Sequence, residues 1–343
     1  MSKTQPTIKD VARRAGVSHA TVSYVLAGSK HASRISKETK LRVWAAAEEL
    51  GYKFNPVGRA LKRGHTDTIL LLIVTWQMAK SHSQTAMALS RSATMRGLQL
   101  TVNIVKNDSE AESFLNHSMI SNHEGLLVLW DSPAVEKSTL AQLANEGLPV
   151  IDLLPGAQGN IESVAADREH AGYTLTRHLI ELGHQRIAFI GDTISRIKTT
   201  MQKYAGYERA LREAGIDIDP SLMQNVEGFG FDGGFQGFQE LITRQLNFTA
   251  VICINDPMAL GAMACAQFMG MQCPRDISFA GYGAFDEGEY WHPSLTTVGL
   301  SADLVAESAV NEIVRLRNNP NAKRANIYIP GELIIRESTG PAP

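Results

Sequence analysis

One short stretch near the N-terminus gathers side chains that could hydrogen-bond to the edges of DNA bases. Apolar residues recur at helical spacing up to Ala15, Gly16 interrupts the pattern, and Ser18 begins a second short helix. Gly16 tolerates the unusual backbone angle of a tight turn, and Ser18 can cap the new helix. The second helix, residues 18–27, turns small and hydrogen-bonding side chains outward. These are His19, Ala20, Ser23, Tyr24 and Ala27. The spacing predicts a helix-turn-helix whose second helix could enter a major groove.

The same two helices could instead belong to an ordinary helical bundle, and Tyr24 could pack inward, two residues from Val22 and Leu26. A third predicted helix, residues 36–50, favours the DNA-binding interpretation because it would close a small three-helix core. Ser36 caps it and Gly51 ends it. We expect its core face to comprise Leu41, Trp44, Ala45, Glu48 and Leu50.

Basic residues are concentrated in this part of the chain. Residues 1–66 hold 13 Lys and Arg against 4 Asp and Glu, whereas the remaining residues hold 20 against 31. A basic end of this size is the electrostatic footprint expected for phosphate contact, and the acidic remainder is poorly suited to lie along a duplex. The alternative is a solvated basic face without a partner.

At residues 52–64, YKFNPVGRALKRG, the sequence resembles the LacI/GalR family of bacterial transcription regulators. The segments that carry the resemblance are IKDVARRAGVSHATVSYVLAG, RISKET at the start of the third helix, and the hinge at residues 55–61. Later motifs extend it over nearly the whole chain. It implies that His19, Ala20 and Tyr24 read bases. The full set of DNA-binding residues is then Thr7, Ser18, His19, Ala20, Thr21, Ser23, Tyr24, Arg34, Asn55, Arg59 and Leu61.

Two residues of the recognition helix depart from the usual family pattern. Tyr24 stands where members usually carry Arg, and Ala20 offers only a methyl group. A tyrosine cannot form the two parallel hydrogen bonds that Arg makes with guanine, so the operator sequence is not expected to follow that of better-known relatives.

The hinge, residues 56–63, is too short to form a stable helix alone and is expected to order on DNA. Two copies could insert Leu61 into the minor groove and bend the duplex, while Arg59 and its basic neighbours neutralise phosphates. Gly58, where Ala is more usual, lowers helix propensity by ~1 kcal/mol. The alternative is a plain basic linker.

From residue 67 onward, continuous apolar runs alternate with amphipathic helices, as in parallel sheets buried on both faces. Strands are predicted at residues 69–74, 98–105, 125–130, 149–154, 164–166, 186–190, 223–227, 250–254, 278–281, 294–299, 327–329 and 333–336. Helices are predicted at residues 84–95, 109–119, 138–146, 168–182, 202–214, 231–246, 257–269 and 301–317. Two doubly wound halves predict a bilobed module that binds a ligand in its cleft.

The fold class expected is therefore an α-helical helix-turn-helix headpiece followed by an α/β two-lobed sensor. The resemblance implies a sensor like a periplasmic sugar-binding protein, with three chain crossings between the lobes. The expected domains are residues 1–53 for the headpiece, 54–66 for the hinge and linker, 67–161 with 301–320 for the first lobe, and 162–300 with 321–343 for the second lobe.

Polar residues at predicted strand ends are the candidate effector ligands. Asn255 and Asp256 begin the helix of INDPMALGAM, which is similar to a family segment whose polar groups bind sugar hydroxyls. Carboxylates and amides suit polyols because each can hold two hydroxyls. The alternative role for Asp256 is an N-cap before Pro257. Asp167 follows another strand.

Further candidates are Lys203, at a position where the family usually has a ligand-binding Arg, and the aromatic residues Trp76, Phe229 and Trp291 in loops after strands. An aromatic face could stack on a sugar or a base, although core packing is the alternative for each. Gly283 stands where relatives usually place an acidic residue. The effector is therefore expected to differ from that of typical sugar sensors.

The composition, with 44% hydrophobic and 20% charged residues, is that of a globular protein, and neither a signal peptide nor a membrane-spanning run is found. Cys253, Cys265 and Cys273 lack paired ligand spacing, which predicts buried free thiols rather than disulfides or a metal site. Glycines at 228, 230 and 233 spell GxGxxG, which leaves a nicotinamide-dependent enzyme as a weak alternative. No nucleophile, base or metal cluster indicates an enzyme, and no cofactor is expected.

The function predicted is that of a cytoplasmic, homodimeric transcription regulator, most simply a repressor. Its partners would be double-stranded operator DNA and a small effector, a sugar or sugar derivative, with no membrane involved. The alternative class is a solute-binding module for transport, which the basic N-terminal end disfavours.

Overall fold

The computed structural model describes residues 6–26, 30–52, 66–75, 78–116, 120, 122–131, 138–154, 161–194 and 197–343. The chain forms two compact units, Met1–Thr66 and Asp67–Pro343. The division falls where the sequence places the end of the linker. Among the described residues, no helix has both the length and the apolar character needed to span a bilayer.

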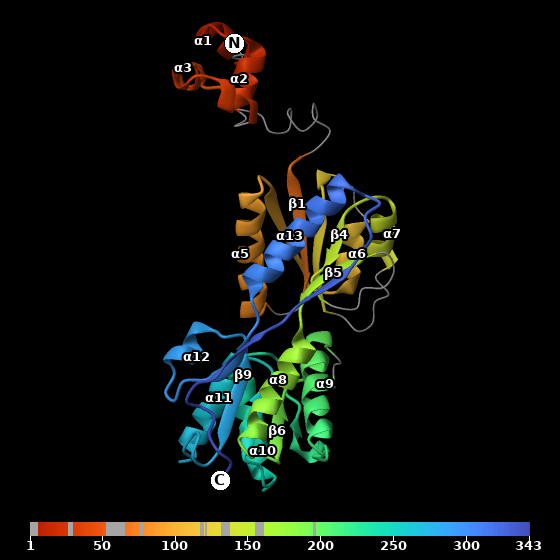
Figure 1. Ribbon diagram of the computed structural model, residues 1–343, viewed down its shortest axis with the longest axis vertical. Coiled ribbons are helices and arrows are strands. Elements are labelled where there is room, and N and C mark those ends of the chain that lie inside the picture. The colour runs from red at the N-terminus through yellow and green to blue at the C-terminus, as the bar shows by residue number, and fades with distance from the viewer. Residues whose placement is uncertain are drawn as a thin grey trace. The chain divides into compact units, whose positions relative to one another are not determined.

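The first unit is a bundle of short helices (Figure 1). They are α1 (Ile8–Ala15), α2 (His19–Leu26) and α3 (Lys37–Glu49), with a 3-10 turn η1 (Lys30–Arg34) between the last two. Gly16 joins α1 to α2 with a left-handed φ of 64°, and Ser18 Oγ accepts the Thr21 N–H at 3.1 Å. The predicted helix-turn-helix is confirmed. Its buried core consists of Val11, Ala12, Ala15, Val22, Val25, Val43, Ala46 and Ala47.

The core face predicted for the third helix is wrong except at Leu50, which packs against the core. Leu41 and Trp44 are 62% and 54% exposed, whereas Val43, Ala46 and Ala47 are buried. Small side chains let α3 approach α1 and α2 closely, so the larger residues remain on the opposite face. Tyr24 is 40% exposed and does not pack inward.

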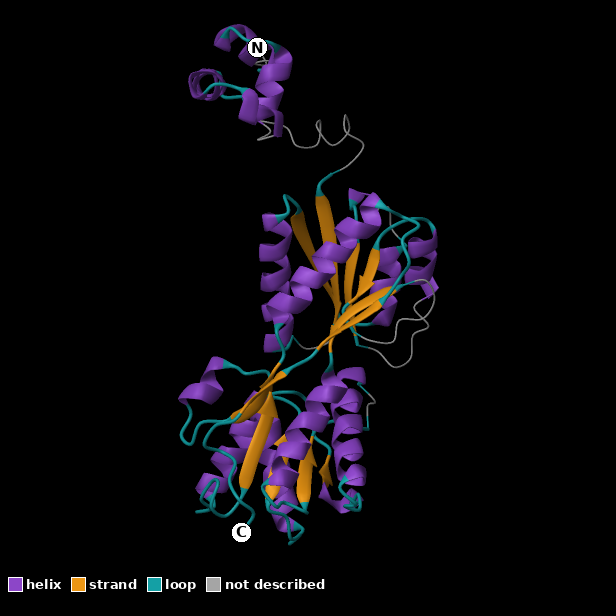
Figure 2. Cartoon of the chain, viewed as in Figure 1, coloured by secondary structure: helices purple, strands orange, loops and turns teal. Residues whose placement is uncertain are grey.

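The second unit contains two sheets that follow one another along its length (Figure 2). The first sheet has the order β11-β5-β4-β3-β1-β2, and its pairs are parallel. Its strands are β1 (Thr68–Val74), β2 (Gln99–Val105), β3 (Leu126–Trp130), β4 (Val150–Asp152), β5 (Glu162–Ala166) and β11 (Asn326–Ile329). Its helices are α5 (Lys80–Met95), α6 (Asp108–Leu115), α7 (Ser138–Asn145) and α13 (Ala302–Asn318). Helices α5 and α13 cover one face of this sheet (Figure 1).

The second sheet has the order β12-β10-β9-β8-β6-β7, with β12 antiparallel to β10. Its strands are β6 (Ile187–Ile190), β7 (Met223–Gln224), β8 (Ala250–Cys253), β9 (Ser278–Tyr282), β10 (Thr296–Gly299) and β12 (Glu332–Ile334). The helices of this lobe are α8 (Arg168–Glu181), α9 (Lys198–Glu213), α10 (Phe231–Thr243), α11 (Asp256–Phe268) and α12 (Asp286–Tyr290), with the 3-10 turn η3 (Pro220–Leu222). Helix α8 packs on α9, and α10 packs on α11. The predicted fold class is confirmed.

Strand pairing corrects two of the expected lobe boundaries. Within the described ranges the chain crosses between the sheets three times, after β5, after β10 and after β11. Residues 162–166 and 326–329 therefore belong to the first lobe, although the sequence assigned both segments to the second. Sheet membership depends on which strand lies alongside, and an isolated apolar run does not encode its neighbour. Strand β2 also differs from expectation because it lies at a sheet edge and is largely exposed.

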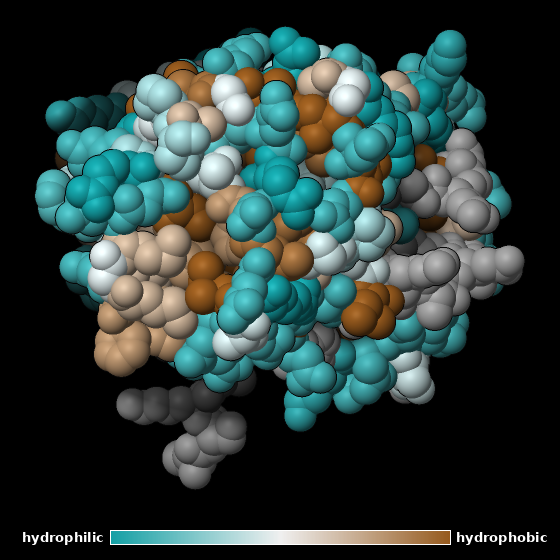
Figure 3. Space-filling view, turned by 90° about the horizontal axis from the view of Figure 1, so that it is seen from below, coloured by the Kyte–Doolittle hydropathy of each residue, from teal (hydrophilic) through white to brown (hydrophobic). Residues whose placement is uncertain are grey.

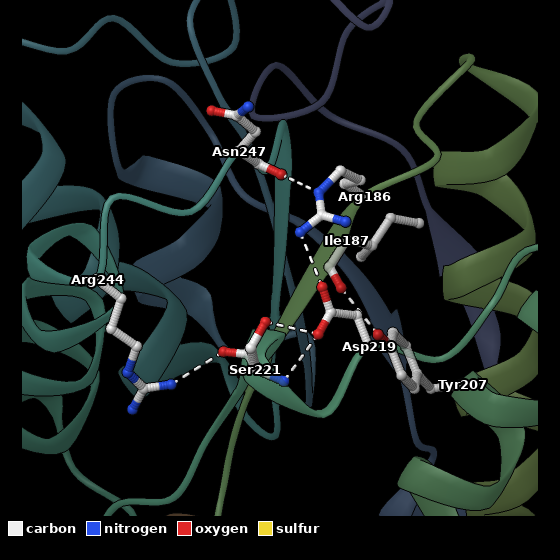
Figure 4. Close-up of polar contacts among 7 residues, drawn as sticks. All are labelled: Arg186, Ile187, Tyr207, Asp219, Ser221, Arg244 and Asn247. Atoms are coloured by element: carbon white, nitrogen blue, oxygen red, sulfur yellow. Dashed lines mark hydrogen bonds and ion pairs between the residues drawn. The ribbon is translucent and has the colours of Figure 1, made fainter.

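Polar contacts tie α9 and the segment around η3 to the start of β6 in the second lobe (Figure 4). Tyr207 on α9 donates its hydroxyl to the Ile187 carbonyl at 2.8 Å. Nearby, Arg186 Nη2 lies 2.8 Å from Asp219 Oδ2, and Asp219 Oδ1 accepts the Ser221 N–H at 2.9 Å. The Tyr207 hydrogen bond holds α9, whose first turns reach the cavity described below.

Candidate functional site

The exposed face of α2 carries the predicted base-reading residues. His19, Ala20 and Tyr24 are exposed, and Ser23 is half-buried on the same helix. Side chains of these types on a projecting helix can reach base edges in a major groove. Thr21 is half-buried, and its hydroxyl lies 2.9 Å from that of Ser18 at the start of the helix.

Two further predicted DNA-binding residues lie elsewhere in this unit. Thr7 precedes α1, where its hydroxyl donates to Asp10 Oδ2 at 2.7 Å, and this hydrogen bond holds the pKa of Asp10 below its usual range. Arg34 is exposed at the end of η1. The remaining predicted residues Asn55, Arg59 and Leu61 lie outside the described residues.

A cavity of about 400 Å³ lies between the two lobes of the second unit. Residues from both lobes line it, and most belong to loops after strands or to the first turns of helices. The polar lining residues include Thr75, Lys80, Ser81, His82, Gln84, Thr85, Asp131, Arg168, Thr199, Thr200, Lys203, Asn255 and Ser301. Ligand sites in open α/β sheets form at this end of the strands.

Arg168 and Lys203 are two of the cationic residues that line this cavity, and Lys80 is a third. Arg168 is the first residue of α8, and Lys203 lies on the second turn of α9. Lys203 Nζ donates to the Ile254 carbonyl at 2.6 Å and lies 5.0 Å from the centre of the Tyr282 ring. Burial, followed by the nearby charge of Arg168, lowers the pKa of Lys203 to about 7, against the opposing charges of Asp256 and Asp131.

Asp131 and His82 are further ionisable residues that line the cavity. Asp131 Oδ1 accepts the Lys198 N–H at 2.8 Å, and its Oδ2 accepts the Thr199 hydroxyl at 2.7 Å. His82 Nδ1 accepts the Ala79 N–H at 3.2 Å, and burial lowers the pKa of this imidazole. The ring is therefore neutral at physiological pH, with its proton on Nε2.

The cavity includes only some of the effector ligands predicted from the sequence. Among the described residues, Lys203, Phe229 and Asn255 line it. Asp167, Asp256 and Trp291 are not among the lining residues. Trp76 lies outside the described residues.

Asp167 and Asp256 have structural partners instead. Asp167 Oδ1 caps α8 by accepting the His170 N–H at 2.9 Å. The carboxylate of Asp256 is buried, where it accepts the Thr297 hydroxyl at 2.6 Å and the Phe285 N–H at 2.9 Å. These contacts join α11 to the strands and loop beside it.

Asp256→Ala is expected to lower the free energy of unfolding by about 3 kcal/mol, because two buried donors lose their acceptor. Asp167→Ala removes only a helix cap and is expected to cost about 1 kcal/mol. Urea unfolding of the two variants measures both values. Equal losses would contradict the distinction between a buried acceptor and a helix cap.

Trp291 packs in the second lobe, with its ring centre 6.2 Å from that of Phe231. The glycines of the GxGxxG segment also serve the fold. Gly228 adopts a left-handed φ of 84°, and Gly230 immediately precedes α10. Strand β7 before them is short and lies at the sheet edge, unlike the first strand of a dinucleotide-binding unit.

Sequence reasoning did not identify Arg168, Asp131 or His82. Arg168, which lines the cavity, directly follows the residue chosen at that strand end. Asp131 follows β3, and the rule that ligands gather after parallel strands could have found it. His82 lies inside the first turn of α5, and its sequence context carries no distinguishing signal.

Comparisons with known proteins agree with this arrangement. Residues 7–55 match the family described as "Bacterial regulatory proteins, lacI family", and residues 176–339 match "Periplasmic binding protein-like domain". The HTH-type transcriptional repressor PurR of Klebsiella pneumoniae (strain 342) is 32% identical over 340 residues, covering 98% of each chain.

Solved structures show the same similarity over the full length. The crystal structure of the lac repressor dimer bound to operator and the anti-inducer ONPF has a TM-score of 0.82 at 26% identity, covering 98% of this chain and 100% of that chain. The transcriptional regulator CelR in complex with cellobiose has a TM-score of 0.71 at 25% identity, covering 97% and 99%. These similarities support neither a transport module nor a nicotinamide-dependent enzyme, and the chain belongs to the LacI family of bacterial regulatory proteins.

Proposed function

We propose that this protein is a cytoplasmic repressor that binds operator DNA as a homodimer and responds to a small effector in the cavity between its lobes. The observation that carries this proposal is a cavity lined by both lobes, on a chain that also presents an exposed recognition helix. Its similarity to a protein named as a repressor, and to one crystallised on its operator, supports the same function.

Contacts between the lobes provide a means of transmitting effector binding. Asp131 belongs to the first lobe, and its partners Lys198 and Thr199 begin α9 in the second. Lys80 on α5 lies 2.7 Å from Glu287 on α12, which also joins the lobes. An effector that binds one arrangement of the lobes more tightly shifts the population toward it. We propose that this shift changes the separation of the two hinge segments and hence operator affinity.

Exposed apolar side chains on the sensor support assembly into a dimer. Strand β2 lies at the edge of its sheet with Val102 and Ile104 exposed, and Phe268 and Tyr290 are more than four-fifths exposed in the second lobe. Apolar patches interrupt the hydrophilic surface of this unit in Figure 3. Exposed apolar surface of this kind favours association with a second copy.

The proposal is tested by selecting DNA fragments from a random library with the full chain. We expect a near-palindromic site whose affinity falls steeply with salt, because binding releases counterions from phosphates. Tyr24→Ala should change which sequences are selected, since Tyr24 is exposed on the recognition helix. Binding without sequence preference, or without salt dependence, would contradict the proposal.

A further inference from the structure

Among the described lining residues, Lys80, Arg168 and Lys203 are cationic and Asp131 is the carboxylate, and Lys80 is paired with Glu287. We propose that the effector carries a carboxylate or phosphate group, which binds between Arg168 and Lys203. This inference rests on the proposed function, because it specifies the ligand class of the same cavity.

Arg168 and Lys203 lie close enough for the charge of one to disfavour that of the other. Arg168 Nη1 lies 3.4 Å from the Ala166 carbonyl, and Lys203 Nζ donates to the Ile254 carbonyl. Burial lowers the pKa of Arg168, and the negative charges of Asp131 and Asp152 act against this shift. An anion between the two cations would relieve their repulsion and replace water lost on burial.

The carboxylates that would serve a neutral polyol are occupied. Both oxygens of Asp131 accept hydrogen bonds across the lobes, and both oxygens of Asp256 accept hydrogen bonds inside the second lobe. The amide of Asn255 is also engaged, with Oδ1 accepting the Met258 N–H and Nδ2 donating to the Phe229 carbonyl. Gly283, at the cavity wall, contributes no side chain.

A helix N-terminus adds to the positive potential. Helix α10 begins at the cavity with Gly230, which supplies no side-chain cap, whereas Asp131 accepts the first N–H of α9 and His82 accepts the Ala79 N–H before α5. The first N–H groups of a helix and its dipole favour negative charge. His82 adds a neutral Nε2–H donor beside them.

An anion held by Lys203 makes binding depend on pH in a defined direction. The groups that face Lys203 are Arg168 from α8, Asp256 from α11 and Asp131 after β3, and its pKa in the free protein is about 7. A bound anion favours the protonated amine and raises this pKa, so binding takes up a proton. Affinity for sulfate, which does not titrate here, should therefore fall by about tenfold between about pH 6 and about pH 8.

The experiment titrates the full chain with inorganic sulfate and with matched compounds: glucose, gluconate and glucose 6-phosphate, then adenosine and AMP. We expect at least one anion to bind more tightly than its neutral counterpart, by about tenfold or more. A preference for gluconate or for the phosphates identifies the anionic group. Arg168→Gln and Lys203→Met should each weaken this binding by about tenfold, and Lys203→Met should abolish the pH dependence. Arg177→Gln, on the exposed face of α8, is the matched control and should leave binding unchanged.

Two outcomes overturn the inference. In the first, no tested anion, sulfate included, loses affinity when Arg168 is replaced. In the second, a neutral compound binds both variants as tightly as it binds the unaltered chain. Operator binding measured in parallel separates this inference from the proposed function. If a neutral compound controls operator binding and both variants retain the response, the anion inference fails and the regulatory function stands. If anions bind through Arg168 and Lys203 without changing operator affinity, the regulatory function fails and the anion inference stands.

Discussion

Val22→Asp is expected to abolish operator binding while leaving the effector cavity intact. Val22 lies at the centre of the core that joins α1, α2 and α3 and has no exposed surface. An unpaired carboxylate there costs several kcal/mol, and a unit of this size has little stability to lose. Operator affinity should fall by more than about 100-fold, because each 1.4 kcal/mol changes an equilibrium about tenfold.

Leu41→Asp is the matched control for this variant. It introduces the same charge into the same unit, but Leu41 is mostly exposed on α3. Circular dichroism during thermal unfolding should show the headpiece transition retained in Leu41→Asp and lost in Val22→Asp. Sulfate affinity should be unchanged in both, since the cavity belongs to the other compact unit. If Leu41→Asp also unfolded the headpiece, the core observed around Val43 would be contradicted.

The contrast between Leu41 and Val43 shows what the sequence encodes about the headpiece and what it leaves open. Gly16 and Ser18 marked the turn correctly, because a left-handed angle and an N-cap require particular residue types. The face of α3 was misjudged because large apolar residues were given more weight than small ones. Helices that approach closely bury Ala and Val, and this choice depends on interhelical distance, which no single helix specifies.

At the effector cavity, too, the sequence indicates the segment but not which of its side chains faces inward. Parallel strands place polar residues at one edge, so the loops around Asp167 and Asn255 were correctly located from the sequence. At α8 the two roles fall on neighbouring residues, because Asp167 caps the helix while Arg168 lines the cavity. At α11, Asn255 both caps the helix and lines the cavity, while its neighbour Asp256 is buried. Only the rotation of each helix about its axis separates these roles.

Gly172→Ala is expected to weaken anion binding by about tenfold and to lower the free energy of unfolding by about 2 kcal/mol. A Cβ at Gly172 would lie 2.1 Å from the carbonyl oxygen of Lys203, and one at Gly206 would lie 2.0 Å from that of Glu169. Both obstacles are backbone atoms, so α8 and α9 must move apart to accommodate the methyl group. Because Arg168 begins α8 and Lys203 lies on α9, this movement separates the two cations.

Gly233→Ala is the control for Gly172→Ala. It tests whether the expected losses of anion affinity and stability come from the close approach of α8 to α9 and not from the loss of a helical glycine. Gly233 lies on α10 in the same lobe, and a Cβ there would meet its nearest atom at an ordinary 3.4 Å. Alanine favours helix over glycine by ~1 kcal/mol, so this control should be neutral or slightly stabilising. Sulfate titration and urea unfolding of both variants give the comparison. If Gly172→Ala proved as harmless as Gly233→Ala, the spacing between Arg168 and Lys203 would not depend on the contact of α8 with α9. In that case the two cations would be positioned by their own loops, and the affinity of the cavity for anions would tolerate changes in helix packing.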